Sequence, residues 1–211
     1  MNRRSFLSAS LTSTAVSAPL LGKDRNPKIE GKAKSGKKLA WQNGKSYWPI
    51  CLDTATLDKG IGLEDKLRLA AEAGFDCVEP WDRELDQYEK QGGDLKDIKS
   101  LVADLGLYIP SVIGLWNSMD ASEESFKSRL EEHRNRLRMV SAIGSRKVQV
   151  IPNMKLKDSF DHNVASWCYR QILEMAIEDY GMEGAGIVFL NFFSPLSSIA
   201  DATRVAFGAD H

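Results

Sequence analysis

A repeated unit of helix, glycine and strand constrains this sequence more than any other feature. Each unit begins as an amphipathic stretch that ends at a glycine, and a short run rich in apolar residues follows. Glycine just past a helix adopts the left-handed conformation without steric cost. The repeat therefore predicts alternating helices and strands. Its four glycines, 32, 38 and 37 residues apart, are Gly74, Gly106, Gly144 and Gly181.

Apolar spacing supports the helices, and apolar runs support the strands. Leu95, Ile98 and Val102 fall on one helical face in the second unit. The runs VQVIP and IVFLNF are almost continuously apolar, as in parallel strands that are buried on both faces. We expect a helix from about Leu63 and a last helix over 197–208. The expected strands are 48–53, 76–80, 108–114, 147–151 and 186–191.

Strands that alternate with helices predict right-handed parallel βαβ units. Two architectures fit this pattern, an open doubly wound sheet and a (β/α)8 barrel. No GxGxxG fingerprint follows a strand, and the GxG of Gly60 to Gly62 lies in the first expected loop. A complete barrel takes roughly 200 residues or more. Residues 47–211 are fewer, so the pattern alone leaves two α/β folds open: an open sheet, and a TIM-barrel-like domain truncated to about five βα units.

The first 46 residues differ in composition from the rest. Arg3 and Arg4 precede Phe6 and a short apolar, Ser/Thr-rich run, which indicates a twin-arginine export signal over 1–22 and a periplasmic location. A disordered basic N-terminus is the alternative. Residues 23–46 predict a basic flexible linker. The remaining body is acidic, which argues against nucleic-acid binding, and no apolar run is long enough for a stable membrane span.

The repeats carry a resemblance to a known family. LAAEAGFDCVEPW, LGLYIPSVIGL, AIGSRKVQV and YGMEGAGIVFLNFFSPLSSIADA occur in this order over about residues 47–211. In order and spacing they resemble the xylose-isomerase-like TIM-barrel proteins, the sugar phosphate isomerases and epimerases. The resemblance implies the first five βα units of eight. It also implies metal-assisted proton transfer on a small carbohydrate or sugar phosphate.

The same resemblance implies a divalent metal, Mn²⁺, Mg²⁺ or Co²⁺, held partly by a glutamate that ends strand five. In this sequence that position is Phe189, which cannot ligate a hard cation. We therefore predict no metal ligand in this chain, although the family implies the metal. The three cysteines have no CxxC spacing, so we expect free structural thiols.

Polar and aromatic residues at the expected strand ends are the candidate site residues, because barrel sites form at the carboxyl ends of strands. Glu79 is the catalytic candidate; a structural role at the barrel rim is the alternative. For the tryptophans the alternative is loop packing, and for Asp53 it is a cap or turn. The substrate-binding candidates are Asp53, Trp81, Trp116, Asn117, Asn153 and Asn191.

The three histidines are weaker candidates. His133 lies on the apolar stripe of the third helix, which predicts packing. His162 lies near the start of the fourth helix, where a capping or surface role is expected, and His211 is the last residue.

Three functional readings stay open. The first is a sugar phosphate isomerase or epimerase, the second a carbohydrate-binding remnant without catalysis, and the third an incomplete fragment without activity. An open partial barrel exposes strand edges, so we also expect self-association.

Overall fold

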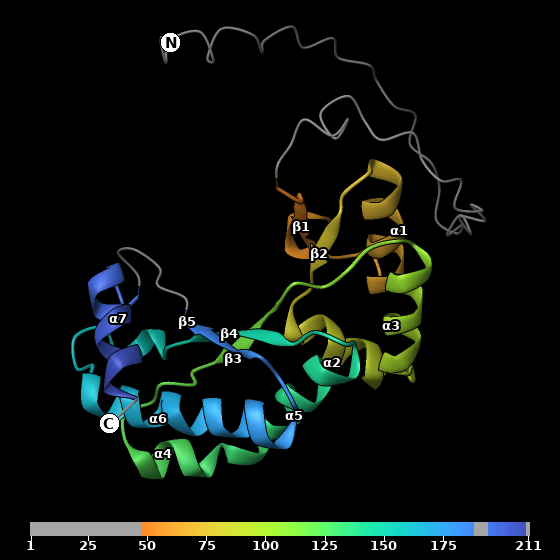
Figure 1. The fold of residues 1–211 in the computed structure, drawn as a ribbon. Coiled ribbons are helices and arrows are strands. Elements are labelled where there is room, and N and C mark those ends of the chain that lie inside the picture. Colours follow the sequence, from red (N-terminus) through yellow and green to blue (C-terminus); the bar gives the residue numbers. More distant parts are fainter. Residues whose placement is uncertain (1–47, 188–193, 210–211) are drawn as a thin grey trace, which may run out of the picture. The chain divides into compact units, whose positions relative to one another are not determined.

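The computed structural model describes residues 48–187 and 194–209 (Figure 1). The strands are β1 (Cys51–Asp53), β2 (Cys77–Glu79), β3 (Val112–Trp116), β4 (Lys147–Ile151) and β5 (Gly184–Ile187). The α-helices are α1 (Leu63–Ala73), α2 (Asp82–Lys90), α3 (Leu95–Asp104), α4 (Glu123–Ser128), α5 (Leu130–Ala142), α6 (His162–Glu174) and α7 (Ile199–Gly208). A π-helical turn, η5 (Met175–Asp179), extends α6, and two short 3-10 helices are η3 (Thr54–Thr56) and η4 (Met154–Leu156).

All paired strands are parallel, and their order follows the chain. β1 pairs with β2, and β4 pairs with both β3 and β5. Two single parallel bridges, Cys77 with Tyr108 and Trp81 with Ile113, join β2 to the segment that leads into β3. A doubly wound sheet reverses its strand order, whereas a TIM barrel does not. The expectation of a partial TIM-barrel-like α/β fold is thus confirmed.

The repeat glycines end their helices as expected. Gly74, Gly106, Gly144 and Gly181 all have positive φ, between 62° and 83°. Gly74 is the C-cap of α1, and its backbone N–H donates to the carbonyl oxygens of Ala70 and Ala71 in the last turn of that helix. These caps explain why each helix ends where the next strand segment begins.

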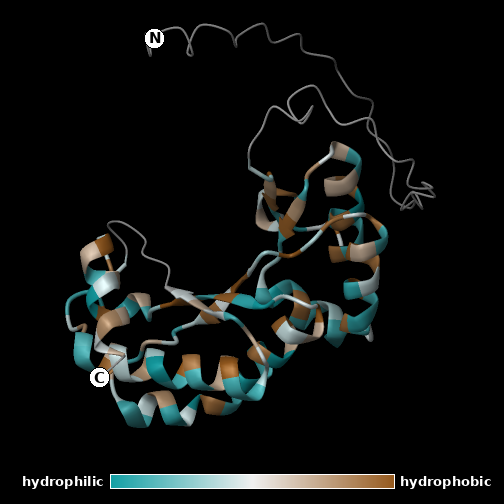
Figure 2. Cartoon of the chain, in the orientation of Figure 1, coloured by the Kyte–Doolittle hydropathy of each residue, from teal (hydrophilic) through white to brown (hydrophobic). Residues whose placement is uncertain are grey.

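The core lies between the strands and the helices that cover one of their faces. Val78, Val112 and Val150 are completely buried on the strands, and Leu67 and Leu137 are completely buried on α1 and α5. Figure 2 shows the helices with hydrophobic and hydrophilic residues on different sides. In the part of the chain that the structure describes, no helix is long and apolar enough to cross a membrane.

Several predicted bounds were wrong. α2 was not predicted, the expected third helix is divided into α4 and α5 at Arg129, and β3 begins later than expected. β4 has the predicted bounds, and β5 begins two residues early. The proposed Phe189 position, Asn191 and His211 lie outside the described residues, as do the expected signal and linker.

Candidate active site

A row of polar side chains lies on the strand face that points away from the helices. Asp53 and Glu79 are direct partners in the β1–β2 ladder, so their side chains share one face. Val78, the neighbour of Glu79, points to the other face and is completely buried. Gln149 alternates in the same way with two buried valines on β4. We call the face that carries Asp53, Glu79 and Gln149 the inner face.

Glu79 is held by two donors, one directly before β3 and one on β4. The Ser111 hydroxyl and the Gln149 amide both donate to Glu79 Oε1, the latter over 2.5 Å. Among the described residues, none donates a hydrogen bond to Glu79 Oε2. The carboxylate is half-buried, so one oxygen is oriented by the protein while the other can accept a proton or a hydroxyl group from a ligand.

Asp53 joins the turn after β1 to the tryptophan after β2. Its Oδ1 accepts the Ala55 N–H over 2.9 Å, which caps η3, and the Trp81 indole N–H over 2.7 Å. The cap role that was the alternative for Asp53 is therefore real, and the same carboxylate also orients Trp81.

Trp81 and Trp116 lie together at the strand ends. Their ring centroids are 5.4 Å apart with the planes inclined by 26°, and the Arg83 guanidinium lies 4.0 Å from the centre of the Trp81 ring. A one-residue bulge between Ile113 and Trp116 pairs Trp116 with Ile151. The structure thus brings Asp53, Trp81 and Trp116 together, although β1, β2 and β3 are far apart in sequence.

A buried ion pair supports this arrangement, and sequence reasoning missed it. Lys66 Nζ lies 2.7 Å from Glu84 Oε1 and 3.0 Å from the Thr54 carbonyl. Glu84 Oε2 accepts the Trp81 backbone N–H over 2.9 Å and the Thr54 hydroxyl. The signal in the sequence was the glutamate three residues after Trp81, the capping position of a helix that begins at Asp82.

The two candidate asparagines that lie within the described residues, Asn117 and Asn153, belong to a different network. The Asn153 amide donates to Asp120 Oδ1 over 3.1 Å, and its oxygen caps η4 at the Lys155 N–H. The Asn117 carbonyl faces Arg129, which also forms an ion pair with Asp120 over 3.2 Å. These contacts hold the loops after β3 and β4; a contact of either asparagine with substrate stays a prediction.

His133 packs in the core as expected, whereas α6 is capped by Asp161 and not by the half-buried His162. His133 is completely buried in α5 and stacks on Phe126 with 5.1 Å between ring centroids. Burial lowers the pKa of His133 to about 4. His162 is the first residue of α6, and its Nε2 lies 3.7 Å from the Asp201 carboxylate.

Comparison with known proteins relates this geometry to one fold. No protein-family model matches the sequence, and no curated protein sequence matches it. Solved structures do match. A xylose isomerase-like TIM barrel/4-hydroxyphenylpyruvate dioxygenase fusion protein has a TM-score of 0.67 at 21% identity, over 79% of this chain and 26% of its own. The fold is that of the xylose isomerase-like TIM barrels.

Two further structures have the same barrel. IOLI protein with a bound zinc atom has a TM-score of 0.65 at 15% identity, over 78% of this chain and 60% of its own. L-ribulose 3-epimerase has a TM-score of 0.62 at 19% identity, over 77% of this chain and 57% of its own. The present chain therefore spans less than two thirds of the length of each of these proteins.

A divalent metal needs several oxygen, nitrogen or sulfur donors that converge on one point. Within 48–187 and 194–209, no three His, Cys, Asp or Glu side chains converge as a cation would require. Asp53 and Glu79 are ladder partners, but the oriented oxygen of each is already occupied by protein donors. The described residues do not fit a divalent metal, so no chemical step is assigned to one.

Proposed function

We propose that this chain binds a small carbohydrate on the inner face and acts on it as a sugar isomerase or epimerase, with Glu79 as the proton-transferring group. The observation that carries the proposal is the Glu79 carboxylate, oriented through Oε1 by Ser111 and Gln149 at the carboxyl end of β2. Reactive groups of TIM barrels lie at this end of the strands.

The surroundings of Glu79 suit a sugar. Carbohydrates offer apolar ring faces and many hydroxyl groups, and Trp81 with Asp53 supplies an aromatic edge beside a carboxylate. L-ribulose 3-epimerase, one of the solved structures with this fold, is named for action on a sugar. A fixed carboxylate that accepts a proton is the group that such chemistry needs.

The proton step follows from the geometry of Glu79. Its Oε2 takes the proton from the carbon next to a sugar carbonyl, and the electrons of the broken C–H bond pass into an enediolate. Glu79 gives an isomer when it returns the proton on the same face to the former carbonyl carbon, while the hydroxyl proton of the first carbon passes to the former carbonyl oxygen. An epimer requires a second acid, which donates a proton to the first carbon from the opposite face while Glu79 keeps the proton that it took. Ser111 and Gln149 keep the carboxylate from rotating during this exchange.

A second candidate function is carbohydrate binding without catalysis. The observation that favours it is Phe189, which occupies the position where the resembling family has a metal-binding glutamate. In that case Glu79 accepts a hydrogen bond from a sugar hydroxyl and no proton leaves carbon. The two candidates share a binding surface and differ in chemistry.

One experiment tests both candidates. The full chain is incubated with L-ribulose or D-fructose in D₂O, and NMR follows binding and deuterium at the carbons next to the carbonyl. Deuterium uptake that Glu79→Gln abolishes and Glu72→Gln retains supports the isomerase or epimerase. Glu72 is the matched control because it is an exposed glutamate on α1. Binding without uptake favours the second candidate, and no binding refutes both.

We further propose that Arg3 and Arg4 direct the protein out of the cytoplasm by the twin-arginine route. The support is the RRSFL sequence, followed by a short apolar run without acidic residues. Fusion of residues 1–46 to a folded fluorescent reporter tests this. Export should require the arginine pair, and a reporter that stays cytoplasmic would refute the proposal.

A further inference from the structure

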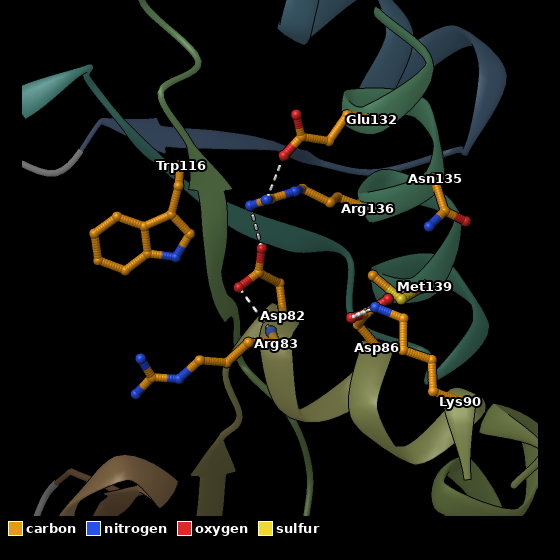
Figure 3. A pocket seen from close by; sticks show the side chains of 9 residues that line it. All are labelled: Asp82, Arg83, Asp86, Lys90, Trp116, Glu132, Asn135, Arg136 and Met139. Atoms are coloured by element: carbon orange, nitrogen blue, oxygen red, sulfur yellow. Dashed lines mark hydrogen bonds and ion pairs between the residues drawn. The ribbon is translucent and has the colours of Figure 1, made fainter. Parts of the chain in front are cut away.

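A groove lies between α2 and α5, and Trp116 at the end of β3 also lines it. It encloses 570 Å³, within the range of small-molecule sites. Figure 3 shows its side chains on the two helices and at the end of β3, with Arg136 reaching from α5 toward Asp82 on α2. The lining residues are Asp82, Arg83, Asp86, Lys90, Trp116, Glu132, Asn135, Arg136 and Met139.

The charges in the groove balance one another. Three acidic and three basic side chains line it, and most are paired: Arg136 with Asp82 and Glu132, and Lys90 with Asp86 over 2.6 Å. An ionic ligand would face as much like charge as opposite charge. Hydroxyl groups both donate and accept hydrogen bonds, so they match a wall of alternating donors and acceptors. The lining therefore favours an uncharged ligand rich in hydroxyl groups.

The wall is rigidly built around Asp82. This carboxylate is only 4% exposed, caps the Arg83 N–H over 2.8 Å and binds Arg136. It packs on Gly114 of β3, where an added Cβ would lie 2.9 Å from Asp82 Cβ. Burial raises the pKa of Asp82, while Arg136 opposes that rise. The buried Asp82 carboxylate therefore holds the Arg136 guanidinium, a donor that lines the groove, in one position.

Two lining residues connect the groove to the inner-face site. Trp116 stacks on Trp81, and the Arg83 guanidinium lies over the Trp81 ring. Trp81 in turn donates to Asp53 on the inner face. One indole ring therefore lies between the two surfaces, and Trp116 offers the groove an aromatic ring of the kind on which sugars stack.

We propose that the α2–α5 groove is a second carbohydrate subsite, which binds an uncharged sugar ring of a disaccharide or glycoside next to the ring bound on the inner face. This inference rests on the proposed function for the identity of the first ring. The inference narrows the substrate class to sugars larger than a monosaccharide. It also implies that the ring bound in the groove carries no phosphate.

The test uses the full chain with ¹⁵N-labelled tryptophan. The indole N–H signals of Trp81 and Trp116 are assigned with single Phe variants. Trp116 lines the groove and reports on it, whereas Trp81 contacts residues of both surfaces and reports on both. The ligands are D-glucose, maltose, cellobiose, sucrose and D-glucose 6-phosphate. Asn135→Phe fills the groove from the exposed side of α5, and Asn163→Phe is the matched control on α6.

We expect at least one uncharged disaccharide to shift the Trp116 signal and to bind more tightly than glucose. Asn135→Phe should weaken that binding about tenfold, which is about 1.4 kcal/mol, while Asn163→Phe leaves it unchanged. Failure of every uncharged disaccharide to shift Trp116, or tightest binding by the phosphate, would overturn the subsite.

The outcomes also separate the subsite from the proposed function. In one outcome, glucose shifts the Trp81 signal, disaccharides bind no more tightly than glucose, and Asn135→Phe does not change binding. That result would refute the subsite and leave the inner-face proposal intact. Disaccharide binding that depends on Asn135 but not on Asp53, tested as Asp53→Asn, would uphold the groove as a sugar site and refute the inner face.

Discussion

Lys66 Nζ lies 2.7 Å from Glu84 Oε1, and both side chains are nearly buried, at 5% and 15% exposure. The pair links α1 to the first turn of α2, where Glu84 also accepts the Trp81 backbone N–H. Because Trp81 is the ring between the inner face and the groove, this ion pair positions the residue on which both proposals depend.

Removal of one partner of the Lys66–Glu84 ion pair should lower the free energy of unfolding. Lys66→Met leaves the Glu84 carboxylate buried without its partner, and we expect a loss of about 3–5 kcal/mol in the free energy of unfolding. Urea denaturation measures it. The double variant Lys66→Met/Glu84→Gln should recover part of the loss, and Lys90→Met, at an exposed pair, should cost less than about 1 kcal/mol. Equal losses for Lys66→Met and Lys90→Met would contradict the positioning role.

His133 should make the protein sensitive to acid. Its imidazole is completely buried, and neither ring nitrogen has a hydrogen-bond partner among the described residues. Burial lowers the pKa of His133 from 6.5 to about 4 in the folded state; Glu132 opposes this change, and the nearby arginines add to it. The unfolded chain therefore binds a proton first as the pH falls below 6.5, and stability is lost between pH 6.5 and 4.

Replacement of His133 should remove that sensitivity. His133→Leu keeps an apolar side chain at the site, so its stability relative to the native chain should rise by up to roughly 3 kcal/mol between pH 7 and pH 4. Urea denaturation at several pH values measures the difference. Parallel stability curves for the two proteins would contradict this prediction, because they would show that His133 has the same pKa in the folded and the unfolded chain.

Gly114 should tolerate no side chain. An added Cβ would lie 2.9 Å from Asp82 Cβ, so Gly114→Ala forces the start of α2 away from β3. We expect a loss of about 1–3 kcal/mol and a shifted Trp116 indole signal. Gly186→Ala is the matched control, because an added Cβ at this strand glycine meets nothing within 4 Å. A neutral Gly114→Ala would mean that α2 can move freely.

The chain should associate with itself in solution. Among the described residues, β1 and β5 each pair with a strand on one side, and α7 exposes Ile199 and Phe207 at 69% and 67%. Unpaired strand edges and exposed apolar side chains favour association. Light scattering should give a mass above 23.5 kDa that rises with concentration, and Ile199→Lys/Phe207→Lys should lower it. A monomer at every concentration would refute this.

Local features were predicted where local physics decides them. The helix from Leu63, the glycine caps and the bounds of β4 depend on neighbours within a few residues, and all three agree with the structure. α2 was missed because its sequence, DRELDQYEK, is mostly polar. It forms because Glu84 caps it and Leu85 is completely buried against the rest of the fold.

The repeat, the strand order that a parallel βαβ chain prefers and the position of Glu79 and Asp53 at strand ends all follow from the order of residues along the chain. Which of these residues contact one another depends on how the strands pack. Glu79, Ser111 and Gln149 come from three strand segments and touch through side-chain alternation across the ladder. In a regular strand, the Trp116 side chain would lie on the same face as Gly114, two residues earlier. The extra residue in β3 changes this face, so that Trp116 pairs with Ile151. A one-residue bulge of this kind has no periodic signature, so the contact of Trp116 with Trp81 had to come from the packed fold.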